Sequence, residues 1–253
     1  MSIPLRAWLF RDPSEPSTIT IEFDGEVHRI RLRRRKQARR YTLRIHSASR
    51  EVVLSLPPRG SLKQAHEFAL KNAAWIATRL RRLPDAVPFA HGVRVPLRGI
   101  EHRIDHRADA RGAVWIEKHG CEHLICVAGG EAHLSRRVRD FLKREARHDL
   151  TFASHSASDA LGVRIRRVSV RDQTSRWGSC SSTGVLSYSW RLILAPSFVL
   201  EYLAAHEVAH LIEMNHSRRF WCLVERICPH VSRAKAWLDA HGSDLHRYGL
   251  EAG

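Results

Sequence analysis

Alternating hydrophobic and polar positions dominate the first half of the chain and predict short β-strands. Residues 18–23 (TITIEF) alternate, an Asp-Gly pair typical of a tight hairpin turn follows, and residues 26–33 alternate again. Apolar residues at helical spacing predict one long helix over about 61–83, which begins with a capping-box pattern. Further strands are expected at 41–45, 52–56, 93–97, 102–105, 114–117 and 124–127.

The second half of the chain is mainly helical in pattern. One helix is expected over about 131–161, and two strands are expected over 163–170 and 185–190. Runs of strands followed by runs of helices predict the α+β fold class. A Gly-Gly pair at 129–130 marks the expected boundary between a β-rich, basic part (17–130) and a second part (131–245). Three further helices are expected from about 197, over 218–227 and over 232–241.

Composition adds a strong positive charge to this picture. The 253 residues contain 42 Lys and Arg against 26 Asp and Glu, a formal net charge of +16. Eight of these cations lie within Arg29–Arg40 (RIRLRRRKQARR). One interpretation is a contact with nucleic acid or a phosphorylated ligand. The other is a solvated strand edge that charge protects from pairing with another chain. The sequence leaves both open.

The apolar positions and the cysteines indicate in which cellular compartment the protein is expected. No stretch approaches the ~20 consecutive apolar residues that a membrane helix needs, so no membrane partner is expected. The first residues lack the uninterrupted apolar segment and cleavage site of a secretory signal. The five cysteines are odd in number and form no C-x-x-C pair, which favours a reducing compartment over a disulfide framework. We therefore expect a cytoplasmic protein.

The helix expected after residue 196 carries the pattern His206-Glu207-x-x-His210. Two histidines four residues apart lie on one helical face, so both imidazoles can reach one metal ion. Glu207, directly after the first of them, can act as a general base toward water at such a site. These residues are the candidate metal ligands and the candidate catalytic base.

His216, six residues after the second histidine, is the favoured third ligand. A continuous helix would turn it away from the pair, so the helix must end first. We expect Asn215 to end it in the left-handed conformation and Ser217 to cap the next helix. Glu213, on nearly the same helical face, and Glu225, on the following helix, are alternative third ligands.

Two segments around these histidines resemble the YgjP-like metallopeptidase family, which is related to the SprT-like and WLM zinc peptidases. They are RWGSC at 176–180 and LSYSWRLILAPSFVLEYLAAHEVAHLIEMNHSRRFW at 186–221. The Arg-rich strand ending in RRY at 39–41, the stretch VVLSLPPRG and the helix with Trp75 extend the resemblance over most of 25–240. It implies a minimal zincin-like core, with zinc on the three histidines and Glu207 as base. Ser189 departs from it, since such proteins often have Asn there.

We therefore predict a zinc-dependent hydrolase, in the first place a metallopeptidase with a peptide or protein substrate. The strand at 185–190 is expected to pair with an extended substrate. Tyr188, Ser189 and Arg176 are candidate substrate contacts, and His230 or Tyr188 could stabilise an oxyanion. Cys180 is expected to be a structural thiol. The alternatives are a metal-dependent nucleotide or phosphoester hydrolase, and a nucleic-acid-binding protein with a purely structural metal.

Overall fold

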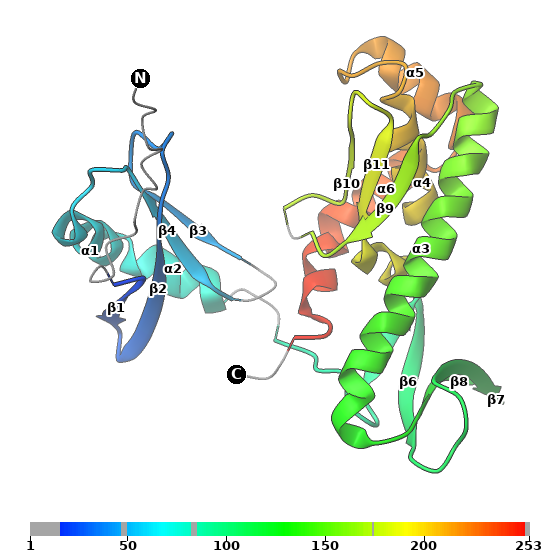
Figure 1. The fold of residues 1–253 in the computed structure, drawn as a ribbon, viewed down its shortest axis with the longest axis horizontal. Coiled ribbons are helices and arrows are strands. Elements are labelled where there is room, and N and C mark those ends of the chain that lie inside the picture. The colour runs from blue at the N-terminus through cyan, green and yellow to red at the C-terminus, as the bar shows by residue number, and fades with distance from the viewer. Residues whose placement is uncertain (1–15, 47–49, 82–84, 174, 251–253) are drawn as a thin grey trace, which may run out of the picture. The chain divides into compact units, whose positions relative to one another are not determined.

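The computed structural model describes residues 16–46, 50–81, 85–173 and 175–250, and its contacts divide the chain into two compact units, residues 1–83 and 84–253 (Figure 1). Each unit combines strands and helices, which confirms the predicted α+β class. No helix within these described ranges is long and apolar enough to cross a membrane.

The first unit is a four-stranded sheet covered on one face by two helices. Its strand order is β1-β2-β4-β3, in which β2 and β4 are parallel and the outer pairs are antiparallel. Apolar side chains of the sheet, such as Ile30 and Leu54, form one core with the helices, for example with Ala69. The elements are β1 (Thr18–Phe23), β2 (Glu26–Arg34), β3 (Thr42–Ile45), β4 (Val52–Leu56), α1 (Leu62–Lys71) and α2 (Ala73–Arg81).

The long helix expected over about 61–83 is two helices, because α1 ends at Lys71 with Asn72 as its C-cap. The Asn72 side-chain amide donates a hydrogen bond to the carbonyl of Phe68 (2.8 Å). A side chain that bonds to nearby backbone offers an alternative to the helical pattern. Ser61 caps α1 through the backbone N–H of Gln64, as the capping box predicts.

The second unit begins with another four-stranded sheet, of order β5-β6-β8-β7. Buried residues of this sheet, such as Val95 and Ile125, share one core with α3 and α4. The compact units therefore divide at 83/84 and not at the expected Gly129-Gly130 boundary, because this sheet packs on the helices that follow it. The elements are β5 (Arg94–Leu97), β6 (Ile100–Arg107), β7 (Val114–His119), β8 (Glu122–Ala128) and α3 (Leu134–Leu161).

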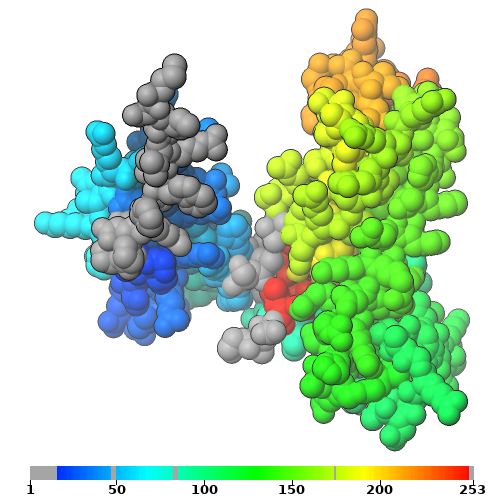
Figure 2. Space-filling model, viewed as in Figure 1, coloured from blue at the N-terminus to red at the C-terminus, as the bar shows by residue number. Residues whose placement is uncertain are grey.

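Helix α3 runs the length of the second unit (Figure 1; Figure 2 shows the same view with all atoms filled). It contacts both sheets of the unit. It ends at Gly162, whose φ of 66° lies in the left-handed region that favours glycine. The second sheet of the unit has the order β10-β11-β9. Its strands are β9 (Arg167–Arg171), β10 (Gly178–Cys180) and β11 (Val185–Ser189), and β10 was not expected.

Helix α4 (Ser197–Ala209) lies in the middle of this unit and contacts α3, β10, α5 (Arg218–Ile227) and α6 (Val231–His241). It is apolar on nearly all sides, which is typical of a helix enclosed by other elements. Short 3₁₀ helices precede α3 (Glu131–His133), precede α4 (Trp190–Leu194) and follow α6 (Gly242–Arg247). The central place of α4 puts its carboxyl end, with the histidine motif, beside β10 and α5.

Candidate metal centre

Three histidine side chains converge at the end of α4. One candidate ligand nitrogen from each of His206, His210 and His216 lies within 4.8 Å of the other two. The Nε2 atoms of His206 and His216 are 3.0 Å apart. Two nitrogens bound to one tetrahedral zinc at the usual bond length would be about 3.3 Å apart. Among the described residues, this is the one group of His, Cys, Asp and Glu side chains close enough to share a metal ion.

The loop after α4 brings His216 back to the other two histidines. The helix ends at Ala209, earlier than expected, with His210 as its C-cap. Asn215 does not take the expected left-handed conformation. Its side-chain oxygen instead accepts a hydrogen bond from the backbone N–H of Ser217 (3.0 Å), an Asx turn that reverses the chain locally. Ser217 caps α5, as predicted, by accepting from the N–H of Phe220 (3.3 Å).

Neither alternative carboxylate belongs to the histidine group. Glu213 contacts the histidine group only through its backbone: its carbonyl oxygen lies 3.0 Å from Nδ1 of His210. This contact leaves Nε2 of His210 free, as in metal sites where a carbonyl holds the second nitrogen of a ligand. Glu225 is exposed on α5. The structure thus brings together the favoured set, His206, His210 and His216.

Aromatic side chains of α5 hold the three imidazole rings. Phe220 is fully buried and stacks on His210, with ring centroids 4.5 Å apart. The edges of the other two imidazoles meet the same phenyl ring at centroid distances of 4.8 Å. Trp221 stacks on the His216 ring (5.9 Å). The two aromatic residues therefore limit how far the histidines can rotate.

The donor set fits a zinc ion. Burial lowers the pKa of His206 to about 4, and burial also lowers the pKa of His210. Both imidazoles are therefore neutral at pH 7, which is the form that binds a metal. Three protein nitrogens, with no fourth His, Cys, Asp or Glu ligand among the described residues, are typical of zinc sites that keep one position for water.

Glu207 is enclosed between α4 and β10. Its side chain is 5% exposed, and burial raises the pKa of its carboxyl to about 7 although the Arg176 guanidinium opposes the shift. A Cβ atom added to Gly178 would overlap Oε1 of Glu207. The carboxylate is therefore packed directly against the backbone of β10.

Two of the expected substrate contacts face the core. Tyr188 is fully buried and its hydroxyl is hydrogen-bonded to Ser154 (3.0 Å). Ser189 is fully buried and donates to the carbonyl of Gln173 (3.2 Å). The expectation that Tyr188 and Ser189 contact a substrate is wrong, because tertiary packing buries the strand that carries them. Tyr188 is excluded as an oxyanion donor for the same reason.

Arg176 and His230, the remaining candidates for contact with a substrate or an oxyanion, lie outside the buried core strand. Arg176 is exposed and close enough to Glu207 to oppose the rise in its pKa. His230 packs edge-on against Phe198 and does not belong to the histidine group. The expectation that the strand at 185–190 pairs with a substrate is also wrong, because β11 already lies between β10 and β9.

The sequence reasoning missed β10 as an element of the site. Its three residues, Gly178 to Cys180, are too few to show strand alternation, so no pattern predicted them. A polar cleft of about 640 Å³ lies along them, and Arg176, Ser179 and Cys180 are part of its wall. Burial raises the pKa of the Cys180 thiol to about 11, so it is protonated at neutral pH and is not a nucleophile.

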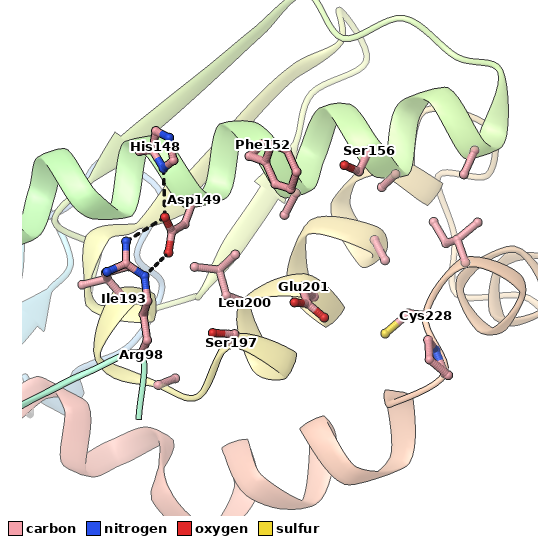
Figure 3. Close-up of a pocket in the computed structure, with 17 residues that line it drawn as sticks. Arg98, His148, Asp149, Phe152, Ser156, Ile193, Ser197, Leu200, Glu201 and Cys228 are labelled. Carbon is pink, nitrogen blue, oxygen red and sulfur yellow. Dashed lines mark hydrogen bonds and ion pairs between the residues drawn. The ribbon is translucent and has the colours of Figure 1, made fainter. Parts of the chain in front are cut away.

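A separate apolar cavity of about 370 Å³ lies between α3 and α4 (Figure 3). Arg98 pairs with Asp149 at one end of it (2.7 Å), and Glu201 and Cys228 lie toward the other. None of the three histidines lines it. The cavity is therefore distinct from the candidate metal centre.

Two comparisons with known proteins found similarity to this chain. The profile of a family described as YgjP-like, metallopeptidase domain matches residues 39–241. Among solved structures, the chain is similar to the metallopeptidase zymogen abylysin of Pyrococcus abyssi, with 26% identity and a TM-score of 0.34. That similarity covers 39% of this chain and 97% of the other. No curated protein has significant similarity to the chain.

Proposed function

The chain belongs to the YgjP-like family of metallopeptidase domains, and from this premise we propose that it is a zinc-dependent peptidase. His206, His210 and His216 would hold the zinc ion. The observation that carries the proposal is the convergence of three imidazole nitrogens at the end of α4, the helix that also carries the buried carboxylate of Glu207. When bound, zinc supplies a Lewis acid that polarises a carbonyl and lowers the pKa of water toward about 7.

Glu207 would act as general base and then as general acid in this reaction. An oxygen of its carboxylate accepts the proton of the attacking water, and the resulting acid donates it to the nitrogen of the leaving amine. The packing of this side chain against Gly178 limits its rotation, so the carboxylate keeps one orientation in which to accept a proton from the attacking water. Burial supports the role, because it raises the pKa of this carboxyl above its ordinary value and so makes it a better proton acceptor.

The free edge of β10 is the proposed place for the substrate backbone. The N–H of Ser189 bonds to the carbonyl of Trp177, and the N–H of Ser181 bonds to the carbonyl of Val185. Alternation along an antiparallel pair then directs the backbone groups of Gly178 and Cys180 away from β11. An extended peptide pairing there by β-augmentation would pass beside Glu207.

The decisive experiment compares zinc-loaded and chelated full-length protein on an unstructured peptide and on nucleoside triphosphates. We expect zinc-dependent cleavage of the peptide, measured by mass spectrometry of the products. Hydrolysis of the triphosphates alone would instead support the phosphoester alternative. A protein that binds zinc and cleaves neither substrate would support a structural metal.

Replacing Gly178 with alanine should disable the site without removing the zinc. The new methyl group would overlap the Glu207 carboxylate, which must move away from the attacking water. A displacement of about 1 Å can cost about 100-fold in rate, and we expect a loss of that order in kcat/KM for a peptide.

The matched control is Gly130→Ala. Gly130 has a φ of −59° and no atom within 4 Å of an added Cβ, so alanine fits there without strain. We expect wild-type activity from it and unchanged zinc content from both variants. Full activity of Gly178→Ala would contradict the role given to the contact between Glu207 and β10.

A further inference from the structure

One face of the sheet in the first unit carries a row of arginines. Along β2, Ile30 and Leu32 point into the core with the helices, and the alternating Arg29, Arg31 and Arg33 are exposed on the opposite face. Arg44 of β3 lies on the same face. Strand β4 runs between β2 and β3, and its Val53 pairs with Arg31 on one side and with Arg44 on the other. With strands spaced as in ordinary sheets, these two backbones are about 10 Å apart.

A concavity of about 570 Å³ continues this face at the end of β2. Polar hydroxyl and amide groups stand among its guanidinium groups, and no acidic residue lines it. Its lining residues are Arg35, Gln37, Ala38, Arg39, Arg40, Thr42, Arg44 and Ser55. The concavity therefore offers hydrogen-bond donors and positive charge to an anion.

The cations of the Arg-rich segment differ in role. Arg34 donates to three backbone carbonyls between residues 57 and 60, which holds the loop before α1. Arg31 pairs with Glu51 (3.1 Å). Within the described part of the chain, the remaining guanidinium groups on this face and in the concavity have no carboxylate partner. These are Arg29, Arg33, Arg35, Arg39, Arg40 and Arg44.

We propose that this arginine face, formed by those six arginines, binds the phosphate backbone of single-stranded nucleic acid. Guanidinium groups bind phosphate oxygens through two parallel hydrogen bonds. The arginines extend beyond the concavity along the sheet. A phosphodiester chain carries a negative charge at every nucleotide, so successive phosphates of one strand can bind successive arginines. Acidic peptides of mixed composition lack that regular charge.

The same geometry predicts binding without sequence preference. In the described residues no aromatic side chain lines the concavity, so stacking with bases has no platform there. Binding rests on the phosphates and should weaken steeply with salt. For about four phosphate contacts, the affinity for a single strand should fall about 50-fold between 50 and 200 mM salt. This inference concerns the first unit and is independent of the proposed peptidase activity.

The test measures binding of fluorescent 20-nucleotide oligouridine and oligothymidine to the full-length protein by anisotropy. The variant combines Arg39→Ala, Arg40→Ala and Arg44→Ala. We expect its affinity to fall at least about tenfold and its salt slope to shrink by about 2, because three phosphate contacts are lost. Equal binding of the two oligonucleotides would indicate phosphate contacts alone. Tighter binding of oligouridine would identify RNA through its 2′-hydroxyls.

A matched control removes the same charge elsewhere. Arg111, Arg147 and Arg164 are exposed residues of the second unit, and replacing all three with alanine should leave affinity within about twofold. Thermal unfolding of both variants checks that they fold. Equal losses in the two variants would overturn the proposal, because net charge alone would explain binding. Full competition by polyglutamate at equal charge would also overturn it in favour of an acidic protein partner.

Discussion

Changing Glu207 to glutamine should lower kcat/KM for peptide cleavage by about 100- to 10,000-fold while zinc stays bound, which is the range that a general base contributes. The amide has nearly the size of the carboxylate, so it fits the space beside Gly178. It cannot accept a proton from water at neutral pH. The change also removes a buried charge, so we expect no loss of stability.

The measurement combines peptide kinetics with zinc content determined by atomic emission. Glu201→Gln is the matched control, because Glu201 lies on the same helix but is exposed and lines the cavity of Figure 3. We expect that control to keep wild-type kinetics. Unchanged turnover in the Glu207 variant would refute the assignment of the base, and loss of zinc would mean that Glu207 helps to bind the metal.

Replacing His216 with alanine should remove most of the zinc and, with it, the activity. Only the nitrogens of His206 and His210 would then remain, and two nitrogens bind zinc far more weakly than three. Loss of a mere hydrogen-bonding neighbour of a ligand costs about 10- to 100-fold in metal affinity, so loss of a ligand should cost more. The side chain is exposed, and the fold should therefore keep its thermal midpoint.

Zinc affinity measured by competition with a chromophoric chelator tests this expectation. His241→Ala serves as the control, since His241 is an exposed histidine of α6 outside the group. Glu213→Ala and Glu225→Ala complete the series and should keep the metal. If one of them loses zinc and His216→Ala keeps it, a carboxylate is the third ligand and the histidine assignment is wrong.

Local patterns predicted much of the secondary structure. Period-two alternation placed the hairpin of β1 and β2, since one face of each strand is buried on the helices. The 3.6-residue period and Gly162 placed α3 and its end. Ser217 was identified as the cap of α5 for a similar reason, because capping depends on residues that are close in the chain.

Other expectations failed because they depended on packing between distant segments. The expected pairing of the strand at 185–190 with a substrate fails, because β11 has neighbouring strands on both edges and helix α3 covers Tyr188. The Gly129-Gly130 pair resembles a linker, but the sheet before it shares its core with the helices after it. The separation of α1 and α2 at Asn72 depends on a side-chain hydrogen bond to the backbone that competes with the helical hydrogen bonds. The spacing of apolar residues gives no sign of such a bond.

The sequence by itself determined the α+β class, the Arg-rich segment at 29–40 and the spacing that puts His206 and His210 on one face of a helix. These properties follow from composition and from periods of a few residues. Only the tertiary structure decided that the loop after α4 returns His216 to that face, that β10 encloses Glu207, and that Arg44 joins the arginine face from another strand. Such contacts join residues that are distant in the chain, and their geometry depends on how whole elements pack.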